Sequence, residues 1–509
     1  MNKNDYLKIG KATDLTGSDR KLYRAFEMLP GILSWGTLSG LVLFSFLKPV
    51  WVAYFIIAFD VYWLLLVVYL GIHLFISYRK MKENLRVDWR AECQKISGWN
   101  EIYHLIILPT YNESYEIIRP GIEALSAEGY PREKMIVVLA IEEREGPAGE
   151  EKARRLEKEY GNSFMKFFIT RHPDNIPGEL KGKGANQSFA AREAKEKIID
   201  AEKIDYDKIL VSVFDIDTII YSGYFYRLTH AFLTVPDPYR ASYQPIPLYH
   251  NNVWRAPFFA RVAASSNTFW QMMQQVRQEK LATYSSHSMT WRALYEMGFW
   301  SISMVSEDSR IFWHGFCHYN GDYRVEPLYF PLSMDVTMDK SPIATMKSLY
   351  RQQRRWGWGV ENVPYLCFNF IKNFKTAPKG KYLGRIFVQV YGFHSWATNA
   401  LIIGVIGWLP VLIGGRDFNA MVISSNLPFV TRMLMTFAMI GLVFSAVIST
   451  LLLPSRPKNY GFGKSLSMFL QWLVLPVSII VFGSIPGIEA QTRLALGKYL
   501  GFFVTPKER

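Results

Sequence analysis

The chain has 509 residues, of which 50% are hydrophobic and 15% aromatic, and its mean hydropathy of +0.03 excludes a purely soluble protein and suits one enzyme domain with several membrane spans. The formal net charge of +14 comes without any recognisable nucleic-acid-binding motif, so no nucleic acid is expected, and membrane lipids and nucleotide phosphates are the predicted anionic partners. The three cysteines, Cys93, Cys317 and Cys367, are scattered, which argues against a disulfide framework or a zinc site and favours a reducing compartment.

A hairpin of two apolar runs is predicted near the amino terminus, over residues 29–78. Leu29–Leu47 and Val50–Tyr78 are each long enough to cross a bilayer, and the first begins too late to be a cleaved signal peptide. Basic residues flank the pair, with Lys3, Lys8, Lys11, Arg20, Lys21 and Arg24 before it and Arg79, Lys80 and Lys82 after it. The positive-inside rule therefore places the basic segment 1–28 and the residues after 78 in the cytosol.

A second membrane region is predicted over residues 382–487. It holds three apolar runs, Val390–Ile413, Met433–Leu453 and Leu466–Ile485, and Pro410 and Pro476 interrupt two of them. Five runs of this length with little charge favour a multi-pass protein of the cell membrane over buried core helices. Asp60 is the exception inside the second run, and it either lines a passage or makes an interhelical contact.

Residues 79–381 are too polar to span a membrane and are numerous enough for one cytosolic enzyme domain. Short β-rich runs alternate there with helix-like ones: His104–Leu108, then Ser114–Ala127; Met135–Ile141, then Ala148–Glu159; Phe164–Ile169, then Gln187–Ala201; and finally Ile209–Phe214. This alternation predicts an α/β domain with a largely parallel sheet. Ligands of such sheets bind beyond the carboxyl ends of the strands.

Polar residues follow three of these predicted strands at the end where a ligand is expected. They are Thr110-Tyr111-Asn112-Glu113 after the first run, Glu142-Glu143 after the second, and Asp215 and Asp217 after the last. Asp215 and Asp217 are two positions apart, so a strand presents both carboxylates on the same side. Paired carboxylates suit Mg²⁺ or Mn²⁺, which also takes oxygens from a diphosphate. An Asp-x-Asp alone is weak, because two acids at a strand end often form a solvated turn or a helix cap.

Five motifs in order resemble those of the membrane-bound family 2 glycosyltransferases, the group that contains cellulose, chitin and hyaluronan synthases. They are Pro109-Thr110-Tyr111-Asn112-Glu113, Gly182-Lys183-Gly184-Ala185-Asn186, Asp215-Ile216-Asp217, Ser306-Glu307-Asp308 and Gln352-Gln353-Arg354-Arg355-Trp356. The resemblance covers roughly residues 105–356 and the membrane layout. It implies an α/β GT-A fold, a Rossmann-like domain that binds a nucleotide-sugar, joined to an α-helical transmembrane region.

The resemblance also implies a role for each motif residue. On the donor side, Tyr111 stacks on the base, Thr110 and Glu113 hydrogen-bond the nucleoside, and Lys183 meets the phosphates or nucleoside. Asp215 binds the nucleotide side and the metal, and Asp217 binds the metal directly, so that the Mg²⁺ or Mn²⁺ ion stabilises the leaving diphosphate. Asp308 is the expected general base toward the acceptor hydroxyl, with Glu307 beside it on the acceptor side.

A helix is predicted over Ile343–Gly359, where Gln352, Arg355 and Trp356 project together. Gln352 and Arg355 are expected to bind the donor, with Arg355 on the diphosphate, and Trp356 offers a flat face to the acceptor sugar. A plainer reading is that this helix lies in the membrane interface. One position departs from the family, because Glu142 stands where an Asp is usual; its carboxylate is still expected to reach the base.

The leading functional hypothesis is an inverting, metal-dependent synthase that takes a UDP- or GDP-sugar and extends a polysaccharide. Transfer of one sugar to a lipid-linked acceptor is the alternative within the same chemistry. A transporter or receptor whose cytosolic domain only binds a nucleotide is the alternative of another class.

The carboxyl-terminal segment, residues 488–509, is predicted to lie on the cytosolic side. It contains the basic residues Arg493, Lys498, Lys507 and Arg509, and Phe502-Phe503-Val504-Thr505 resembles the Phe-x-Val-Thr gating loop of cellulose synthases. Phe502, Val504 and Thr505 are therefore candidate gating residues. We expect Ile488–Leu500 to form an amphipathic helix at the interface and one late run, Leu466–Ile485, not to cross fully.

Overall fold

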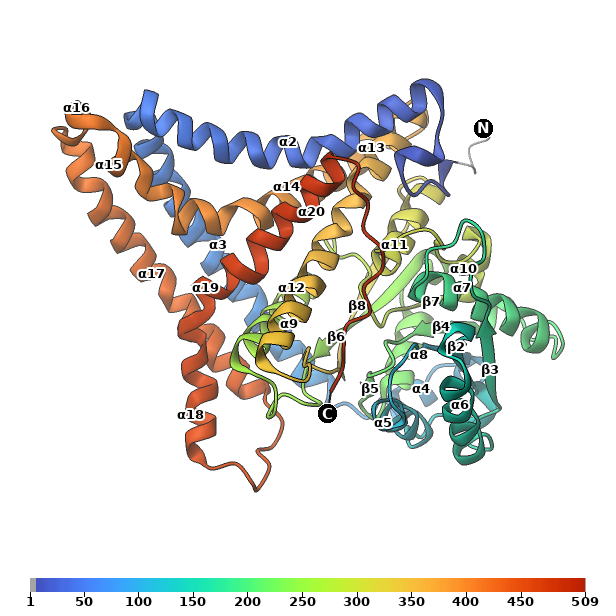
Figure 1. Cartoon of the computed structure of the whole chain (residues 1–509). Helices are drawn as coiled ribbons and strands as arrows, with labels where there is room; N and C mark the ends of the chain where they lie inside the picture. Colours follow the sequence, from blue (N-terminus) through green and yellow to red (C-terminus); the bar gives the residue numbers. More distant parts are fainter. Residues whose placement is uncertain (1–5, 509) are drawn as a thin grey trace.

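The computed structural model describes residues 6–508, so Lys3 and Arg509, two of the basic residues named above, lie outside the described part. An α/β domain occupies one side of the molecule, and long helices extend from it on the other (Figure 1). The predicted combination of an α/β domain with a helical membrane region is confirmed.

One eight-stranded sheet runs through the α/β domain in the order β3-β2-β1-β4-β7-β6-β8-β5. The strands are β1 (Tyr103–Pro109), β2 (Met135–Glu142), β3 (Lys166–His172), β4 (Ile209–Val213), β5 (Ile219–Ile220), β6 (Ala241–Leu248), β7 (Ser288–Thr290) and β8 (Arg324–Ser333). In the parallel half, Leu105 of β1 pairs with Ile136 of β2 on one side and with Val211 of β4 on the other.

The sheet is largely parallel, as predicted, and only two short strands, β5 and β7, run in the opposite direction. β3, β2, β1 and β4 are parallel, whereas β7 is antiparallel to both β4 and β6, and β5 is antiparallel to β8. β6 and β8, which the sequence pattern did not reveal, pair with each other in parallel and carry prolines: Pro245 and Pro247 in β6, and Pro327 and Pro331 in β8. Proline donates no ladder hydrogen bond and normally argues against a strand, and the pairing of β6 with β8 shifts register between Gln244 and Ile246.

Helices cover both faces of the sheet. Successive residues of a strand point to opposite faces, so Leu105 and Ile107 join one core while Ile106 and Leu108 join the other. The first core is completed by α7 (Lys183–Ala194), α10 (Trp291–Met297), α11 (Glu307–His318) and α13 (Asn362–Lys372). The second is completed by α4 (Trp89–Gln94), α5 (Tyr115–Ser126), α6 (Pro147–Tyr160) and α8 (Tyr224–Thr234).

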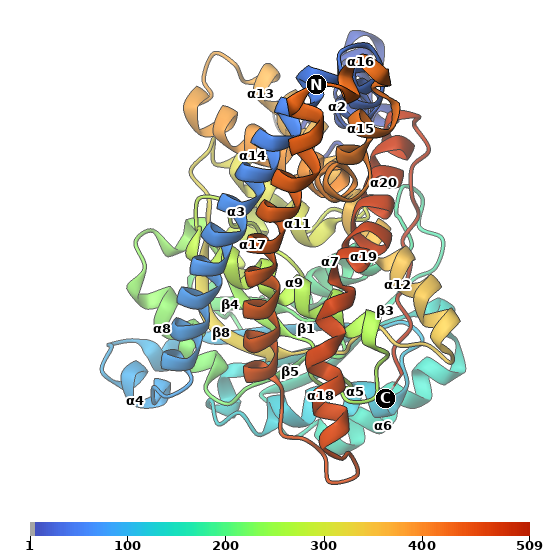
Figure 2. The same cartoon turned by 90° about the vertical axis from the view of Figure 1, so that its left-hand side faces the viewer.

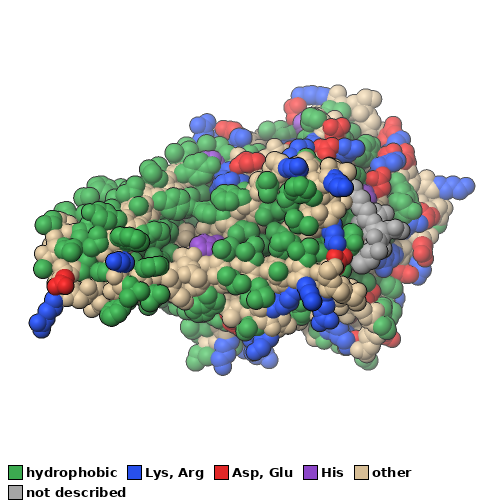
Figure 3. Space-filling model, turned by 90° about the horizontal axis from the view of Figure 1, so that it is seen from above, with side chains coloured by type: hydrophobic (Ala, Val, Ile, Leu, Met, Phe, Trp, Pro, Cys, Tyr) green, Lys and Arg blue, Asp and Glu red, His purple; other side chains and the backbone are tan. Residues whose placement is uncertain are grey.

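Four helical stretches of the described chain are long and apolar enough to cross a bilayer, or five if one bent pair is a single span. They include α2 (Gly17–Leu47), α3 (Pro49–Asn84), α17 (Val422–Leu452) and the broken stretch Phe462–Ala495. The bent pair is α14 (Lys379–Gly404) with the residues Ile406–Ile413, which include α15 (Leu409–Ile413). Seen from above, the narrow end of the molecule is covered by hydrophobic side chains with few charges (Figure 3).

The predicted spans are shorter than the helices observed. α2 begins at Gly17, inside the segment expected to precede the hairpin, and α3 ends at Asn84, six residues past the predicted end. A new helix begins at each proline that was expected to interrupt a run: α15 and α19 (Leu475–Ile479) carry Pro410 and Pro476 in the first turn. Proline has no N–H to donate to the preceding turn, which is why a new helix begins there. Asp60 is buried against α17, beside Thr431, in the manner of an interhelical contact.

The broken stretch Phe462–Ala495 starts and finishes against the α/β domain. It contains α18 (Phe462–Leu470), α19 and α20 (Ile485–Ala495) (Figure 2). Met468 of α18 packs in a cluster with Trp254, and Leu494 of α20 packs in another with Trp358. The stretch is long and apolar enough to cross a bilayer, so the expectation that Leu466–Ile485 does not fully cross stays a prediction. The helix predicted over Ile488–Leu500 stops earlier, at Ala495, because Gly497 takes a left-handed conformation with φ of 69°.

Two helices link the α/β domain to this membrane region. α9 (Phe258–Val276) packs against α3 and the sheet, and α12 (Pro342–Gly357) packs against α20. The predicted helix Ile343–Gly359 is therefore observed with its ends shifted by one or two residues. After α20 the last residues run back as an extended tail past α12 toward the sheet (Figure 1). The tail brings the carboxyl terminus to the ends of the parallel strands.

Candidate active site

Lys183 joins two of the predicted motifs in one cluster. Its Nζ atom lies 2.7 Å from Oδ1 of Asp215 and 2.9 Å from Oδ1 of Asp308. Asp215 follows β4, Lys183 opens α7, and Asp308 lies in the first turn of α11. The fold therefore brings together three residues that are far apart in the sequence, as predicted.

Gly184 allows α7 and α11 to approach so closely. A β-carbon at this position would lie 2.7 Å from the carbonyl oxygen of Ser301 and 3.0 Å from Cβ of Glu307. Neither the backbone nor the start of α11 has room to move, so glycine is required for the two helix ends to meet.

The buried carboxylate of Asp217 is held from several directions. It is 2% exposed, its Oδ2 accepts a hydrogen bond from the backbone N–H of Asp335 at 2.9 Å, and its own backbone carbonyl accepts one from Asn251 at 2.8 Å. Lys507, in the carboxyl-terminal tail, donates to Oδ1 and forms an ion pair with it. A buried carboxylate at this strand end is thus paired with a cation from the other end of the chain.

The charges of the cluster set the protonation states of its members. Burial alone raises the pKa of Asp215, but the ammonium groups of Lys183 and Lys507 outweigh burial and hold that pKa well below its usual range. Burial lowers the pKa of Lys183, and the carboxylates of Asp215 and Asp308 more than reverse that effect. Asp215 is therefore ionised and Lys183 is charged at neutral pH.

Glu307 behaves differently from its neighbour in the sequence. It is 2% exposed, whereas the side chain of Asp308 is 21% exposed. Burial, followed by the negative charge of Asp308, raises the pKa of Glu307 to about 8. The pair therefore divides into a neutral, enclosed acid and an accessible carboxylate, and Asp308 is the one of the two with the exposure that a base acting on a substrate requires.

In the loop after β1, the carboxylate of Glu113 accepts hydrogen bonds from two other loop residues. Oε2 of Glu113 accepts hydrogen bonds from the Thr110 hydroxyl at 2.9 Å and from the backbone N–H of Tyr111 at 2.7 Å. Burial raises the pKa of the Glu113 carboxyl, and the charge of Lys507 opposes that rise. Glu113 thus lies close enough to the tail to respond to its charge.

Arg144 contacts Tyr111 and Glu142, the two residues that were expected to contact a nucleobase. Its guanidinium lies 3.8 Å from the centre of the Tyr111 ring, and its Nε donates to Glu142 in an ion pair. Nη2 of Arg144 is buried and has no hydrogen-bond partner in the described chain. Tyr111 and Glu142, the two residues expected to read the base, therefore share one flat cationic group that a base would meet or displace.

The residues of α12 line the other side of the cluster. Oε1 of Gln352 accepts a hydrogen bond from Thr337 at 2.7 Å, and Gln352 and Trp356 line a space of about 10 Å³ together with Tyr249. Nε of Arg355 is buried without a partner in residues 6–508, although the charge of Arg355 acts on Glu307. A half-buried guanidinium without an ion pair is a suitable ligand for an anion.

The carboxyl-terminal tail closes over these residues. The Phe502 ring lies beneath the Arg355 guanidinium, 4.8 Å from it, and Asn252 donates to the backbone carbonyl of Glu508 at 3.0 Å. A β-carbon at Gly182 would lie 2.6 Å from Cγ of Phe502, so glycine is needed for the tail to pass. Thr505 is buried and Val504 is half-buried, so all three predicted gating residues belong to a segment packed on the site.

Three residues at the site were missed by the sequence analysis. Lys507 lies two positions beyond the recognised Phe-x-Val-Thr pattern, and Arg144 lies two positions beyond Glu142, so proximity to a motif was the available signal for both. Asp335, whose backbone N–H binds Asp217, follows a proline-containing strand that the pattern did not reveal.

The arrangement fits a divalent cation that shares its coordination with a substrate. No group of three or more His, Cys, Asp or Glu side chains in residues 6–508 is placed to enclose a metal on its own. Mg²⁺ and similar ions commonly use one or two carboxylates and take their remaining ligands from phosphates and water. The Lys507 ammonium already places a positive charge on Asp217, which indicates that this carboxylate is suited to a cation.

No protein-family model matches the chain, and no curated protein matches it either. Among solved structures, a mannosyltransferase from Pyrobaculum calidifontis in complex with GDP-Man and Mn²⁺ is 14% identical, covers 87% of this chain and 100% of its own, and gives a TM-score of 0.43. TarS 1–349 from S. aureus in complex with UDP is 11% identical, covers 69% of this chain and 91% of its own, and gives a TM-score of 0.30. Likenesses this low identify neither the reaction nor the substrate of this chain.

Proposed function

We propose that this chain is a membrane-bound glycosyltransferase that transfers a sugar from a nucleoside-diphosphate donor at the ends of the parallel strands. The observation that carries the proposal is the cluster in which Lys183 bridges Asp215 and Asp308 while a second cation, Lys507, rests on Asp217. Two carboxylates that follow a strand, an accessible carboxylate opposite them and an unpaired arginine nearby meet the chemical needs of diphosphate departure and proton removal.

The donor is held in two parts. Tyr111 offers its ring to the base, and Glu113 with Thr110 supplies polar contacts to the nucleoside. Arg355, whose Nε has no partner, binds the diphosphate with charge-assisted hydrogen bonds. Asp217 and Asp215 hold Mg²⁺ or Mn²⁺, and that ion, when bound, offsets the charge of the leaving diphosphate.

The chemical step is carried by Asp308. Its carboxylate takes the proton of the acceptor hydroxyl as the hydroxyl oxygen bonds to the anomeric carbon, and the bond from that carbon to the diphosphate oxygen breaks. Attack from the face opposite the leaving group inverts the anomeric centre. Lys183 holds Asp308 in place through its hydrogen bond at 2.9 Å.

The tail excludes water while the donor is bound. Phe502 packs between Gly182 and Arg355, and Thr505 is buried, so the segment covers the strand ends as a lid. Water excluded in this way does not compete with the acceptor for the anomeric carbon. The basic residues that flank α2 and α3 favour a cytosolic position for this domain and its tail.

Two products are compatible with this chemistry. We propose extension of a polysaccharide as the reaction, because five motifs that resemble those of polysaccharide synthases occur in order and end in Gln352, Arg355 and Trp356. Transfer of a single sugar to a lipid-linked acceptor is the competing outcome. The test is to incubate membranes holding the full chain with a panel of labelled UDP- and GDP-sugars and to size the product. A polymer supports extension, a single-sugar adduct overturns it, and no transfer from any donor contradicts the enzyme assignment.

A further inference from the structure

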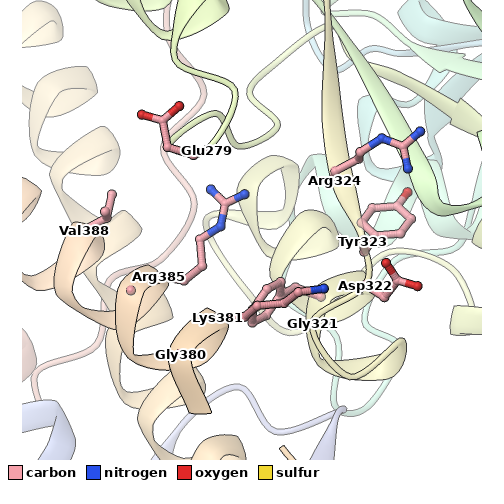
Figure 4. Close-up of a pocket in the computed structure, with 11 residues that line it drawn as sticks. Glu279, Gly321, Asp322, Tyr323, Arg324, Gly380, Lys381, Arg385 and Val388 are labelled. Atoms are coloured by element: carbon pink, nitrogen blue, oxygen red, sulfur yellow. The ribbon is translucent and has the colours of Figure 1, made fainter. Parts of the chain in front are cut away.

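A separate cavity of about 440 Å³ lies at the other end of α11 from Asp308. Its wall includes Phe316 near the end of that helix, Gly321 in the turn after it, Glu279 from the loop after α9, and residues of the first turns of α14 (Figure 4). Phe316 lies eight residues after Asp308 on the helix, which is about 12 Å along the axis. None of the residues proposed above to bind the donor lines this cavity.

One face of α14 forms the floor of this cavity. Gly380, Lys381, Gly384, Arg385 and Val388 all line it, at the spacing of a single helical face. A β-carbon on Gly380 or Gly384 would meet no atom within 4 Å. The glycines thus leave room on this face that a side chain would otherwise fill.

Arg385 projects its guanidinium into the cavity (Figure 4). Its Nη1 is buried and has no hydrogen-bond partner in residues 6–508. Two other charged residues of the wall form ion pairs elsewhere, since Arg324 binds Glu326 and Asp322 binds Arg240, while the charge of Glu279 acts on Arg385. A buried guanidinium N–H without an acceptor is costly, so this arrangement is expected where the oxygen of an anion completes it.

The cavity lies where α14 enters the membrane region. Leu383 and Phe387, on the same two turns, are 54% and 67% exposed, so apolar side chains face outward at this level. Lys379 and Lys381 precede them at the helix start, where the helix dipole also favours a negative charge. A basic recess beside exposed apolar residues has the chemistry that holds a phosphorylated lipid headgroup.

We propose that this cavity binds a phosphate-bearing anion through Arg385, and that the phosphate is that of a phospholipid headgroup at the membrane surface. Arginine suits this role because its planar fork gives two parallel hydrogen bonds to phosphate oxygens. Glu279, on the rim opposite Arg385, repels the anion and limits its affinity.

The test is native mass spectrometry of the purified full chain, titrated with phosphatidylglycerol or with phosphatidylcholine of the same acyl chains. We expect several-fold more protein to retain phosphatidylglycerol, and Arg385→Gln to reduce retention to the phosphatidylcholine level. Lys375→Gln removes an equal charge from an exposed residue outside the cavity and should leave retention unchanged. Equal retention of both lipids, or no effect of Arg385→Gln, overturns the proposal.

Two further variants keep the test decisive if Arg385→Gln folds poorly. Gly384→Leu fills the recess without changing charge and should abolish the lipid preference, whereas Glu279→Gln should increase retention of phosphatidylglycerol. An unchanged result for both contradicts the site.

Equilibrium dialysis with radiolabelled inorganic phosphate, without lipid, distinguishes a lipid headgroup from a soluble phosphate as the source of the anion. Binding there that requires Arg385, without any preference for phosphatidylglycerol, contradicts the lipid headgroup and assigns a soluble phosphate.

Discussion

The ammonium of Lys507, near the carboxyl terminus, donates a hydrogen bond to the carboxylate of Asp217, which follows β4. The two residues are 290 positions apart in the sequence. The negative charges of Asp217, Asp215 and Glu113 raise the pKa of Lys507 above its usual range against the effect of burial, which alone lowers it. The strand end therefore holds a cation, and the tail that supplies it also covers the proposed donor site.

Asp217→Asn should abolish turnover. The substitution removes the charge that holds a divalent cation against the diphosphate, and the loss of several kcal/mol corresponds to at least about 100-fold in rate. Sugar transfer is measured in membranes with excess EDTA and after addition of Mn²⁺ or Mg²⁺. Full turnover of the wild type in excess EDTA would refute the role of a metal.

Gly182→Ala should displace the tail from the site. A methyl group there meets the Phe502 ring at 2.6 Å, so the ring and the residues after it must move. Hydrogen exchange of residues 499–508 should become faster, and turnover should fall by about tenfold as the donor loses its cover. Gly463→Ala adds a methyl group where no atom lies within 4 Å and serves as the matched control. Unchanged exchange in Gly182→Ala would show that the tail does not depend on this contact.

Tyr111→Ala should weaken binding of the donor. Stacking of a base on an aromatic ring contributes about 1–3 kcal/mol, so the dissociation constant should rise by about 10- to 100-fold. Tyr111→Phe keeps the ring beside Arg144 and should bind within a few fold of the wild type. Binding of the nucleoside diphosphate to the purified full chain is measured by calorimetry. Equal affinity for the alanine variant would place the base elsewhere.

Glu307→Gln should be tolerated at neutral pH, because the carboxyl it replaces has a pKa of about 8 and is protonated there. The folded-state pKa lies above the ordinary value of 4.5, so the folded protein binds the extra proton. The contribution of this protonated carboxyl to the free energy of unfolding is complete below pH 4.5 and is lost as pH rises through about 8. Thermal unfolding from pH 5 to pH 9 should show a smaller fall in stability for Glu307→Gln than for the wild type. Parallel curves would contradict the raised pKa, and Glu296→Gln, an exposed carboxyl, is the control.

Strands β1 to β4, and the proximity of the motifs that follow them, could be predicted from the sequence, and the reason is physical. β1, β2 and β4 are continuous buried apolar runs, and parallel strands bring their carboxyl ends to one edge, which placed Glu113, Glu142 and Asp215 together. The other four strands were missed because β6 and β8 contain prolines and because β5 and β7 are only two and three residues long.

Contacts between segments that are distant in the sequence could not be predicted from local sequence patterns. Nothing in the residues around Lys507 specifies that the tail over residues 498–508 folds back toward β4, since that depends on where α20 ends and on the glycine at 182. Arg144 stands among glutamates after β2, whereas its partner Tyr111 comes from the neighbouring strand end. Lengths of the membrane helices were underestimated because their polar ends continue as helix beyond the apolar runs, as in Gly17–Leu47.

Transfer of labelled sugar by Asp308→Asn tests most directly whether this cluster is the active site of a glycosyltransferase. Purified wild-type protein and the variant are compared for transfer from the donor identified in the panel and, separately, for donor binding. Asp237→Asn, an exposed carboxylate with a left-handed backbone that asparagine tolerates, is the matched control. A general base acts on the acceptor proton alone, so turnover should fall by about 10²- to 10⁴-fold while the dissociation constant for the donor stays within a few fold. Unchanged turnover in Asp308→Asn, or an equal loss of binding and turnover, would contradict that assignment.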